Sequence, residues 1–392
     1  MRILSVLPQT GRSAHDVATD LEAMAADDKR PELGRVFSLV YHAGDDVDEV
    51  IAAAHDKYVW HNALNPDVFP SLRRMSSDVV GATAWLLSGG AVDAADPGVT
   101  GSLAGFMTSG GTESILMAVK TAKVRGIEEK DIAHGNVVLA TSAHAAFSKG
   151  CTYFGLEERR VDVDGDYRAV PDAMADACDD DTVLVVASAP QYPQGVIDPV
   201  ADVAAVAADR DVNCHVDACM GGFTLPFLER AGDVAADRLP WDFRVPGVTT
   251  ISADVHKYGY TPKGASVILH RDKASRRRQT FVFDGWLGGF YGSSGILGTK
   301  PGGPIAAAWA SFQYLGVDGF VEKATMAWRA RARLVAIVRA TEGLTVVGAP
   351  EVTLAAIAAD ATSKVAVDPF LVGDALSAKG WHLDRQGPPD SL

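Results

Sequence analysis

The alternation of apolar and polar positions divides the chain into a helical amino-terminal part and a longer part of mixed elements. Residues 13–30 show a helical period that begins at a serine, which predicts a capped helix. Residues 45–58 and 75–87 predict two further helices. Between these two, residues 61–74 (HNALNPDVFPSLRR) hold too much Pro and Asn for a regular element, yet carry large apolar residues. We expect this stretch to pack across a surface.

From about residue 105 onward, short apolar runs alternate with segments of helical period. The run TVLVVASA has no polar alternation, as expected of a strand whose two sheet faces are both covered. Repeated strand–helix units of this kind predict an α/β fold with a mostly parallel central sheet. The predicted strands are 136–142, 159–164, 182–189, 213–220, 248–254 and 265–270, and the predicted helices between them are 112–126, 144–155, 171–179 and 201–211.

The last part of the chain has a different pattern. A glycine-rich stretch, residues 285–303, precedes a long helical run at 305–342, and the remaining residues suit a small α+β domain. We therefore expect three parts, namely an amino-terminal helical segment that makes dimer contacts (1–74), a large domain (75–318) and a small domain (319–392).

Composition narrows the classes of partner. With 47% hydrophobic residues in 392, the chain can bury a large core. Its net charge of −14 argues against nucleic acid or an anionic membrane surface as partner. The run Arg276–Arg278 is the only dense basic spot, and such runs are mostly solvated faces. An anionic small substrate would therefore have to be held by a few local cations.

The cysteines and the amino terminus bear on location. The four cysteines form no CxxC pair and no metal-ligand spacing, so we expect reduced thiols and no metal site. The start of the chain has no signal-peptide pattern. No run approaches the roughly 20 apolar residues of a membrane-spanning helix. We expect a soluble, cytoplasmic protein with no transmembrane segment.

Candidate chemistry follows the predicted strands, because ligands of open α/β sheets bind beyond the carboxyl ends of the strands. Ser109, Gly110, Gly111 and Thr112 open a predicted helix, where unpaired N–H groups and a hydroxyl can hold an anion. This signal is weak alone, because a Ser or Thr cap after glycines is common.

Three further polar residues occupy similar positions. His144 follows one strand, Asp217 ends another, and Lys257 follows a third, on a turn that holds a second lysine, Lys263. Each has an ordinary explanation, such as a core histidine, a paired carboxylate or a solvated turn. Pyridoxal phosphate uses all of these groups together, since its phosphate suits a helix start, its ring nitrogen needs a carboxylate and its aldehyde needs a lysine.

Longer stretches then indicate a family. The chain resembles the sphingosine-1-phosphate lyases, members of the pyridoxal-phosphate-dependent group II decarboxylases with the type I aminotransferase fold. The likeness extends from about Leu7 to the end of the chain. The matching stretches are NPDVFPSLRR, TSGGTESILMAVK, SAHAAFSKG, PQYPQGVIDPV, HVDACMGGF, WDFRVPGVTTISADVHKYGY and GGFYGSSGILGTKPGG. Family members usually continue several dozen residues further, so the resemblance implies that the small domain is incomplete.

The resemblance implies a mechanism. Lys257 carries pyridoxal phosphate, His256 helps to hold its phosphate, His144 covers its ring, and Asp217 keeps the ring nitrogen protonated. The reaction is a retro-aldol cleavage between C2 and C3 of a phosphorylated sphingoid base, which gives a long-chain aldehyde and phosphoethanolamine. The family is homodimeric, and its loop at 291–294, with Gly292 and Ser293, reaches the cofactor phosphate of the neighbouring subunit.

The resemblance also assigns the substrate site. Tyr41, Asn62 and Lys263 match residues that bind the substrate phosphate, and Tyr192 and Lys263 are candidates for the base. Asn65 stands where many relatives have a histidine that contacts this phosphate, so one charge is missing. Two alternatives stay open, namely an amino-acid decarboxylase of the glutamate or aromatic type, and a pyridoxal-phosphate-binding protein without turnover.

Overall fold

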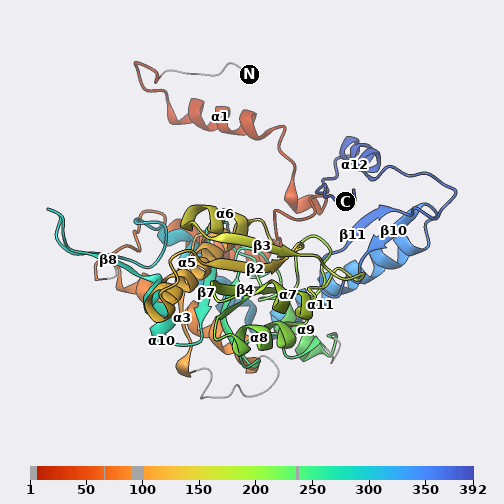
Figure 1. The fold of residues 1–392 in the computed structure, drawn as a ribbon. Helices are drawn as coiled ribbons and strands as arrows, with labels where there is room; N and C mark the ends of the chain where they lie inside the picture. Colours follow the sequence, from red (N-terminus) through yellow and green to blue (C-terminus); the bar gives the residue numbers. More distant parts are fainter. Residues whose placement is uncertain (1–6, 66, 91–100, 235–237) are drawn as a thin grey trace.

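A seven-stranded sheet forms the centre of the molecule (Figure 1). The computed structural model describes residues 7–65, 67–90, 101–234 and 238–392. The strand order is β1-β7-β6-β5-β4-β2-β3, in which β2 to β6 run parallel and β7 is antiparallel to both β6 and β1. The strands are β1 (Ala104–Thr108), β2 (Asn136–Ala140), β3 (Glu157–Val161), β4 (Thr182–Ser188), β5 (Asn213–Asp217), β6 (Val248–Ala253) and β7 (Ser266–His270). The prediction of a mostly parallel sheet is confirmed.

Helices cover the sheet because its inner strands are apolar on both faces. Every residue of β2, β4, β5 and β7 is buried, which fits the absence of polar alternation in these runs. The helices are α1 (Ala14–Ala25), η1 (Pro31–Leu33), α2 (Asp45–Lys57), α3 (Pro70–Trp85), η2 (Leu86–Gly90), α5 (Gly111–Lys130), α6 (Ala146–Phe154), α7 (Pro171–Ala177), α8 (Val200–Asp209), α9 (Leu225–Ala231), α10 (Lys273–Gln279), α11 (Gly302–Arg339) and α12 (Pro369–Ala378).

Strand β1 is absent from the sequence-based prediction. Its run AGFMT is interrupted by Gly105, which weakens a strand pattern. In the structure a Cβ at Gly105 would lie 2.5 Å from Leu269 and 2.8 Å from Val80. Only glycine therefore allows α3 and β7 to pack this closely on the edge strand.

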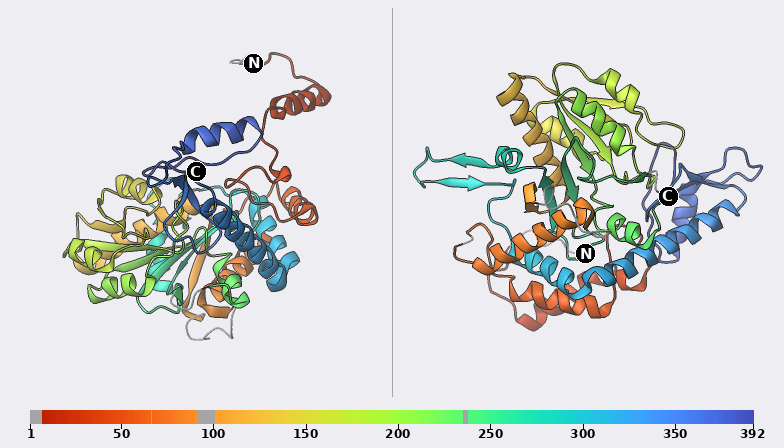
Figure 2. Two further views of the ribbon diagram at one scale, coloured as in Figure 1. Left: turned by 90° about the vertical axis from the view of Figure 1, so that its right-hand side faces the viewer. Right: turned by 90° about the horizontal axis from the view of Figure 1, so that it is seen from below.

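Two small sheets flank the centre. The hairpin β8 (Phe281–Phe283) and β9 (Tyr291–Ser293) projects from the body of the molecule in both Figures 1 and 2. The pair β10 (Leu344–Val347) and β11 (Ala356–Ala359) packs near the carboxyl-terminal end of α11 and, with α12, forms the expected α+β unit.

Helix α11 crosses the domain boundary expected between residues 318 and 319. It has 38 residues, and its one non-helical backbone conformation is at Gly316, with φ of 56°. Glycine tolerates this conformation at low cost, so the helix bends there. The three-part division stays a prediction, with a bend two residues from the proposed boundary.

Candidate active site

The predicted site residues come together at the carboxyl edge of the parallel strands. Strand β5 ends at Asp217, β6 ends at Ala253, and the turn from Asp254 to Ala265 leads into β7. Helix α5 begins directly after β1, on the neighbouring side of β7. Parallel strands thus bring a carboxylate, a lysine turn and a helix start to one edge.

Lys257 lies in a setting unlike a solvated turn. Its Nζ is 3.1 Å from Oδ2 of Asp254, and the two side chains are 23% and 2% exposed. Burial alone disfavours the ammonium, but the charge of Asp254, helped by Asp217 and others, raises the pKa of Lys257 above its ordinary value. The hypothesis of an ordinary turn lysine is wrong at this position.

Asp217 is a buried carboxylate with several partners. Its Oδ1 accepts hydrogen bonds from the Cys219 N–H at 3.0 Å and from the Ser252 hydroxyl at 3.3 Å. Burial by itself raises the pKa of Asp217, but the charge of His144 and the bonds from Cys219 outweigh it and leave the pKa lowered. The carboxylate is therefore ionised at neutral pH.

The start of α5 forms a close cradle against the lysine turn. A Cβ on Gly111 would lie 2.7 Å from both Asp254 Oδ2 and Cys219 Sγ, and one on Gly110 would lie 3.3 Å from the His256 ring. The first N–H to bond within this helix belongs to Ser114, which donates to the Gly110 carbonyl. The earlier N–H groups of the turn are the ones a helix leaves for an anion.

These residues fit pyridoxal phosphate. His256 Nδ1 and Asp254 Oδ1 are buried without a hydrogen-bond partner, which points to a missing polar group beside Lys257. Burial lowers the pKa of His256, so its neutral ring can donate or accept. An ammonium, an ionised buried carboxylate and an anion-binding helix start occur in one cluster. Within the described ranges, no group of three or more His, Cys, Asp or Glu side chains could hold a metal ion.

Ser109, predicted to bind the cofactor phosphate, uses its hydrogen-bond donors within the protein. Its N–H and hydroxyl both donate to Glu113 Oε2, at 2.6 and 2.7 Å. The other oxygen of Glu113 accepts from the Ile296 N–H at 2.6 Å. Glu113 thus connects the cradle to the glycine-rich stretch, whereas Thr112 is exposed.

The predicted substrate residues fall into two groups. Lys263 donates to the His256 carbonyl at 3.1 Å, and its Nζ lies 4.9 Å from the ring centroid of Tyr41. Tyr41 and Tyr192 both interact electrostatically with Lys257, so these residues belong to the lysine cluster. Tyr192 donates to Asp384 Oδ2 at 2.7 Å, and burial followed by this contact raises its pKa to about 12.

Asn62 and Asn65 instead use their side-chain oxygens to accept hydrogen bonds from backbone N–H groups. Asn62 Oδ1 accepts from the N–H groups of Leu64 and Lys300, at 2.9 and 3.3 Å. Asn65 Oδ1 accepts from Asp67 at 3.1 Å. Pro66, inside the matching stretch, lies outside the described residues. The structure does not bring either asparagine into contact with Lys263.

Gly292 and Ser293 lie on β9, away from the cluster in this single chain. The Ser293 hydroxyl donates to the carbonyls of Gly295 and Leu297, at 3.1 and 3.3 Å. Both residues line a cavity of about 630 Å³, and Lys300 lines the same cavity. Burial lowers the pKa of Lys300 to about 8.

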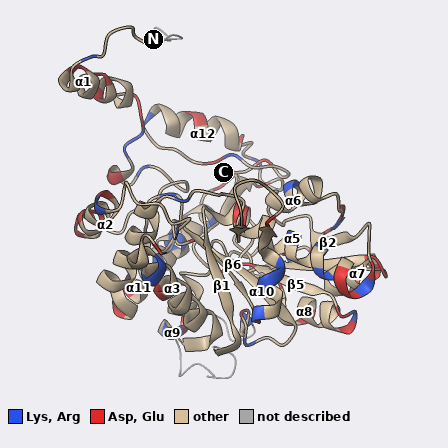
Figure 3. Cartoon of the chain, turned by 90° about the vertical axis from the view of Figure 1, so that its left-hand side faces the viewer, with Lys and Arg blue, Asp and Glu red and all other residues tan. Residues whose placement is uncertain are grey.

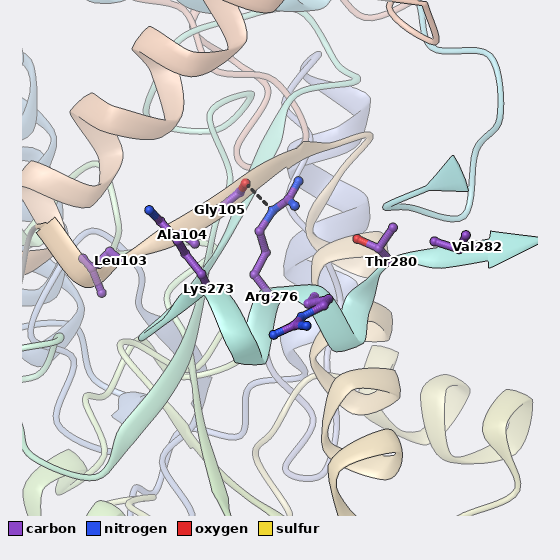
Figure 4. Close-up of a pocket in the computed structure, with 8 residues that line it drawn as sticks. Leu103, Ala104, Gly105, Lys273, Arg276, Thr280 and Val282 are labelled. Carbon is purple, nitrogen blue, oxygen red and sulfur yellow. Dashed lines mark hydrogen bonds between the residues drawn. The ribbon is translucent and has the colours of Figure 1, made fainter. Parts of the chain in front are cut away.

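The basic run of α10 is not simply a solvated face. Its residues show as blue segments in Figure 3. Figure 4 shows Lys273 and Arg276 beside β1, where Arg276 donates to the Gly105 carbonyl at 3.2 Å. Arg278 pairs with Glu128 and Glu129 on α5. Two of the three arginines therefore join α10 to its neighbours.

Sequence reasoning missed Asp254, Glu113 and Asp384. Asp254 stands three residues before Lys257, and a carboxylate directly after a buried strand was an available signal. Glu113 and Asp384 act through contacts with segments remote in sequence, for which the sequence offers no comparable signal.

An apolar groove of about 720 Å³ opens beside the lysine cluster. Its lining includes Tyr41, Tyr192 and Tyr258, residues of α11 and α12, and the β10–β11 pair with the last residues of the chain. Its volume falls within the roughly 300–1,000 Å³ of small-molecule sites. The groove lies next to Lys257 because Tyr41 and Tyr192 belong to both.

Comparison with known proteins adds family and fold. The model described as pyridoxal-dependent decarboxylase conserved domain matches residues 37–359. A sphingosine-1-phosphate lyase of Oryza sativa is 38% identical over 98% of this chain and 69% of its own length. Sphingosine-1-phosphate lyase 1 of Rattus norvegicus is 36% identical over 99% of this chain and 65% of its own. The chain thus spans about two thirds of the length of these relatives.

Solved structures show the same likeness. A sphingosine-1-phosphate lyase of Burkholderia pseudomallei superimposes with a TM-score of 0.91 at 36% identity, over 99% of this chain and 87% of that one. A glutamate decarboxylase of Lactobacillus brevis reaches 0.82 at 21% identity, over 98% and 88%, which shows a shared fold. The expected fold class is confirmed.

Proposed function

Because this chain belongs to the sphingosine-1-phosphate lyase branch of the pyridoxal-dependent decarboxylases, we propose that it cleaves phosphorylated sphingoid bases. The bond between C2 and C3 breaks and gives a long-chain aldehyde and phosphoethanolamine. When bound, pyridoxal phosphate supplies an electron sink for the pair released from that bond. The C3 hydroxyl loses its proton to a base, and C2 gains one.

The residues of the cluster have complementary parts in this proposal. Lys257 would hold the cofactor aldehyde, with its amine oriented by Asp254, which lies 3.1 Å away. Asp217, an ionised carboxylate, would pair with the ring nitrogen, and His144 would cover the ring. Gly110, Gly111 and His256 would form the phosphate cradle, with Ser109 held beside it by Glu113.

One observation favours a phosphorylated long-chain substrate over an amino acid. The Nζ of Lys263 lies 4.9 Å from the ring centroid of Tyr41. Tyr41 also lines the apolar groove. A cation for a phosphate and a space for an alkyl chain therefore adjoin the same reactive lysine. The pKa of Tyr192, raised to about 12, suits a hydrogen-bond donor better than a base.

Product analysis tests the activity. The purified protein is loaded with pyridoxal phosphate and incubated with sphinganine 1-phosphate, and the products are identified by mass spectrometry. We expect hexadecanal and phosphoethanolamine in equal amounts from the wild type and neither from Lys257→Ala. Carbon dioxide released from glutamate or an aromatic amino acid would support the decarboxylase alternative. Bound cofactor without any product would support the non-catalytic one.

We also propose a homodimer with shared sites. The β8–β9 hairpin projects from the body and exposes six large apolar residues, which is more than a solvated hairpin normally shows. They are Phe281, Val282, Phe283, Trp286, Leu287 and Phe290. A neighbouring subunit would cover them and receive Gly292 and Ser293 near its own cradle.

We propose a cytoplasmic location for the chain. In the described part of the chain no helix has the length and apolar character needed to span a membrane. Fractionation of cells that express the protein, with detection in the cytosolic fraction, tests this proposal; recovery with membranes after a salt wash would contradict it.

A further inference from the structure

A row of buried polar side chains lies behind Asp217. His215 and Asp217 lie two residues apart on β5, so their side chains share a face of the sheet. In the parallel register, His215 pairs with Thr250 and Asp217 pairs with Ser252 on β6. His215 and Ser252 have no exposed surface, and Thr250 is 2% exposed.

The four side chains are joined in sequence. His215 Nδ1 lies 2.8 Å from Thr250 Oγ1, and His215 Nε2 lies 3.1 Å from Ser252 Oγ. Ser252 Oγ lies 3.3 Å from Asp217 Oδ1. Cys219 supports the end of the row, because its N–H donates to Asp217 and its thiol donates to Ser252.

The direction of these bonds follows from the charges. Asp217 is ionised and can only accept, so the Ser252 hydroxyl donates to it. Burial lowers the pKa of His215 to about 4, so its ring is neutral and carries one proton. That proton is on Nε2, which donates to Ser252, while Nδ1 accepts from Thr250. Every hydrogen in the row thus points towards the carboxylate.

We propose that His215 is a positioning residue that, through Ser252, holds Asp217 Oδ1 and leaves Oδ2 for the ring nitrogen of the cofactor. Oδ1 already accepts two bonds. Among the described residues, no protein hydrogen bond reaches Oδ2. A carboxylate fixed in this way stays ionised and cannot turn away from the ring. The inference depends on pyridoxal phosphate alone, so it stands whether or not sphingoid bases are the substrate.

A purely structural role would make a different prediction, and the chain offers a matched control. His270 on β7 is also fully buried, its pKa is also lowered to about 4, and it bonds to Gln279 at 2.6 Å. It pairs with Thr250 in the β6–β7 register, but among the described residues no hydrogen bond joins it to Asp217. Loss of either histidine should lower stability, but only loss of His215 should affect the cofactor ring.

The experiment loads variants with pyridoxal phosphate labelled with ¹⁵N in the ring. The ring-nitrogen chemical shift reports protonation, and equilibrium dialysis reports cofactor affinity. Asp217→Asn gives the reference signal for an unprotonated ring. We expect Ser252→Ala and His215→Leu to move towards that signal and to bind cofactor at least about tenfold more weakly, because the charged carboxylate loses its hydrogen-bond support. His215→Gln, whose amide can donate to Ser252, should keep more of the protonated signal.

The control decides the outcome. His270→Leu should lose stability while its chemical shift and affinity match the wild type. If Ser252→Ala and His215→Leu also match the wild type, the row is only structural and the proposal fails. It also fails if His270→Leu loses the protonated signal equally. Should His215→Leu not fold, Ser252→Ala decides alone, because it removes a single oxygen from the row.

Discussion

At the scale of single residues, the cluster depends on charges held in a largely buried setting. Burial opposes the charge of Lys257, and Asp254, 3.1 Å away, is the first of several groups that favour its ammonium form. Among the described residues no carboxylate is in hydrogen-bond contact with Lys263, and burial followed by repulsion from Lys257 lowers its pKa. Its charge is therefore available to an anion.

Replacing Lys263 should separate substrate binding from cofactor binding. A charge-assisted bond to a phosphate is worth on the order of 1.5–3 kcal/mol, so Lys263→Ala should lose about 10- to 150-fold in kcat/KM on a phosphorylated sphingoid base. Its cofactor spectrum should match the wild type. Lys149→Ala, which removes an exposed lysine that stacks on Tyr153, is the control. Equal activity of Lys263→Ala and wild type would remove Lys263 from the substrate site.

Removing the partner of Lys257 should make its amine more reactive. Asp254→Asn removes the negative charge that raises the pKa of Lys257. Burial, which lowers this pKa, then has the larger effect, so the pKa should fall. Each unit of that fall gives about tenfold more free amine at neutral pH. Acylation of the cofactor-free protein, followed by peptide mass spectrometry, should show faster labelling of Lys257 and unchanged labelling of Lys149. Slower labelling of Lys257 would show that Asp254 does not set its charge.

At the scale of elements, α11 forms a wall of the apolar groove. After the bend at Gly316, six of its residues line the groove, namely Ala327, Ala330, Arg331, Leu334, Ile337 and Val338. The length of chain that the groove accepts should therefore depend on side-chain volume along this helix.

A large side chain on this wall should shorten the preferred substrate. Ala330 lines the groove and is exposed, so a larger side chain there fills space without crowding the core. We expect Ala330→Trp to raise KM severalfold for an eighteen-carbon base, because part of its chain loses apolar contact. A short-chain analogue should be unaffected. Ala332→Trp, on the same helix but outside the groove lining, is the control; the same KM change in both variants would argue against the groove.

At the scale of the whole molecule, the β8–β9 hairpin is anchored at its base and exposed at its tip. Gln279 donates to the Ser294 carbonyl, and Ile296 donates to Glu113. The tip residues Trp286, Leu287 and Phe290 are 54%, 108% and 74% exposed. This combination suits an arm that is packed by a second copy of the chain.

Polar substitution of the tip should weaken the dimer. Buried aromatic anchors contribute about 1–2 kcal/mol or more each to protein interfaces. The triple change Trp286→Ser, Leu287→Ser, Phe290→Ser should therefore raise the dimer dissociation constant at least about tenfold, as measured by sedimentation velocity. Serine at Ile127 on α5 and Met326 on α11, both exposed and outside the hairpin and the amino-terminal segment, is the control. A wild type that sediments as a monomer at all concentrations would contradict the dimer itself.

Acid should destabilise the fold partly through its two buried histidines. His215 and His270 have pKa values lowered from 6.5 to about 4 by burial. Between these pH values the unfolded state binds the proton and the folded state does not, so stability falls as pH falls. His270→Gln removes one group that binds a proton only in the unfolded state. Between pH 4 and 6.5, the slope of the free energy of unfolding against pH should therefore decrease by about 1.4 kcal/mol per pH unit. Urea unfolding at a series of pH values and equal protein concentrations measures this slope. Equal slopes for the variant and the wild type would contradict a lowered pKa at His270.

The sequence by itself determined the sheet and the main members of the cluster. Unbroken apolar runs require a sheet covered on both faces, and parallel strands bring their carboxyl ends to one edge. That places Asp217 and Lys257 together, whereas the start of α5 joins them only through β1, a strand that the sequence pattern missed. Helix α3 was predicted to begin at residue 75 and begins at Pro70, because proline suits a first helical turn.

Only the tertiary structure decided which groups the cluster residues meet. The bond between Glu113 and Ile296 joins residues 183 positions apart, and that between Tyr192 and Asp384 spans 192. The row behind Asp217 depends on the register of β5 against β6. The groove depends on where α11 bends. A local pattern records which face of an element is apolar, but it does not record which distant side chain that face will meet, because packing selects the partner.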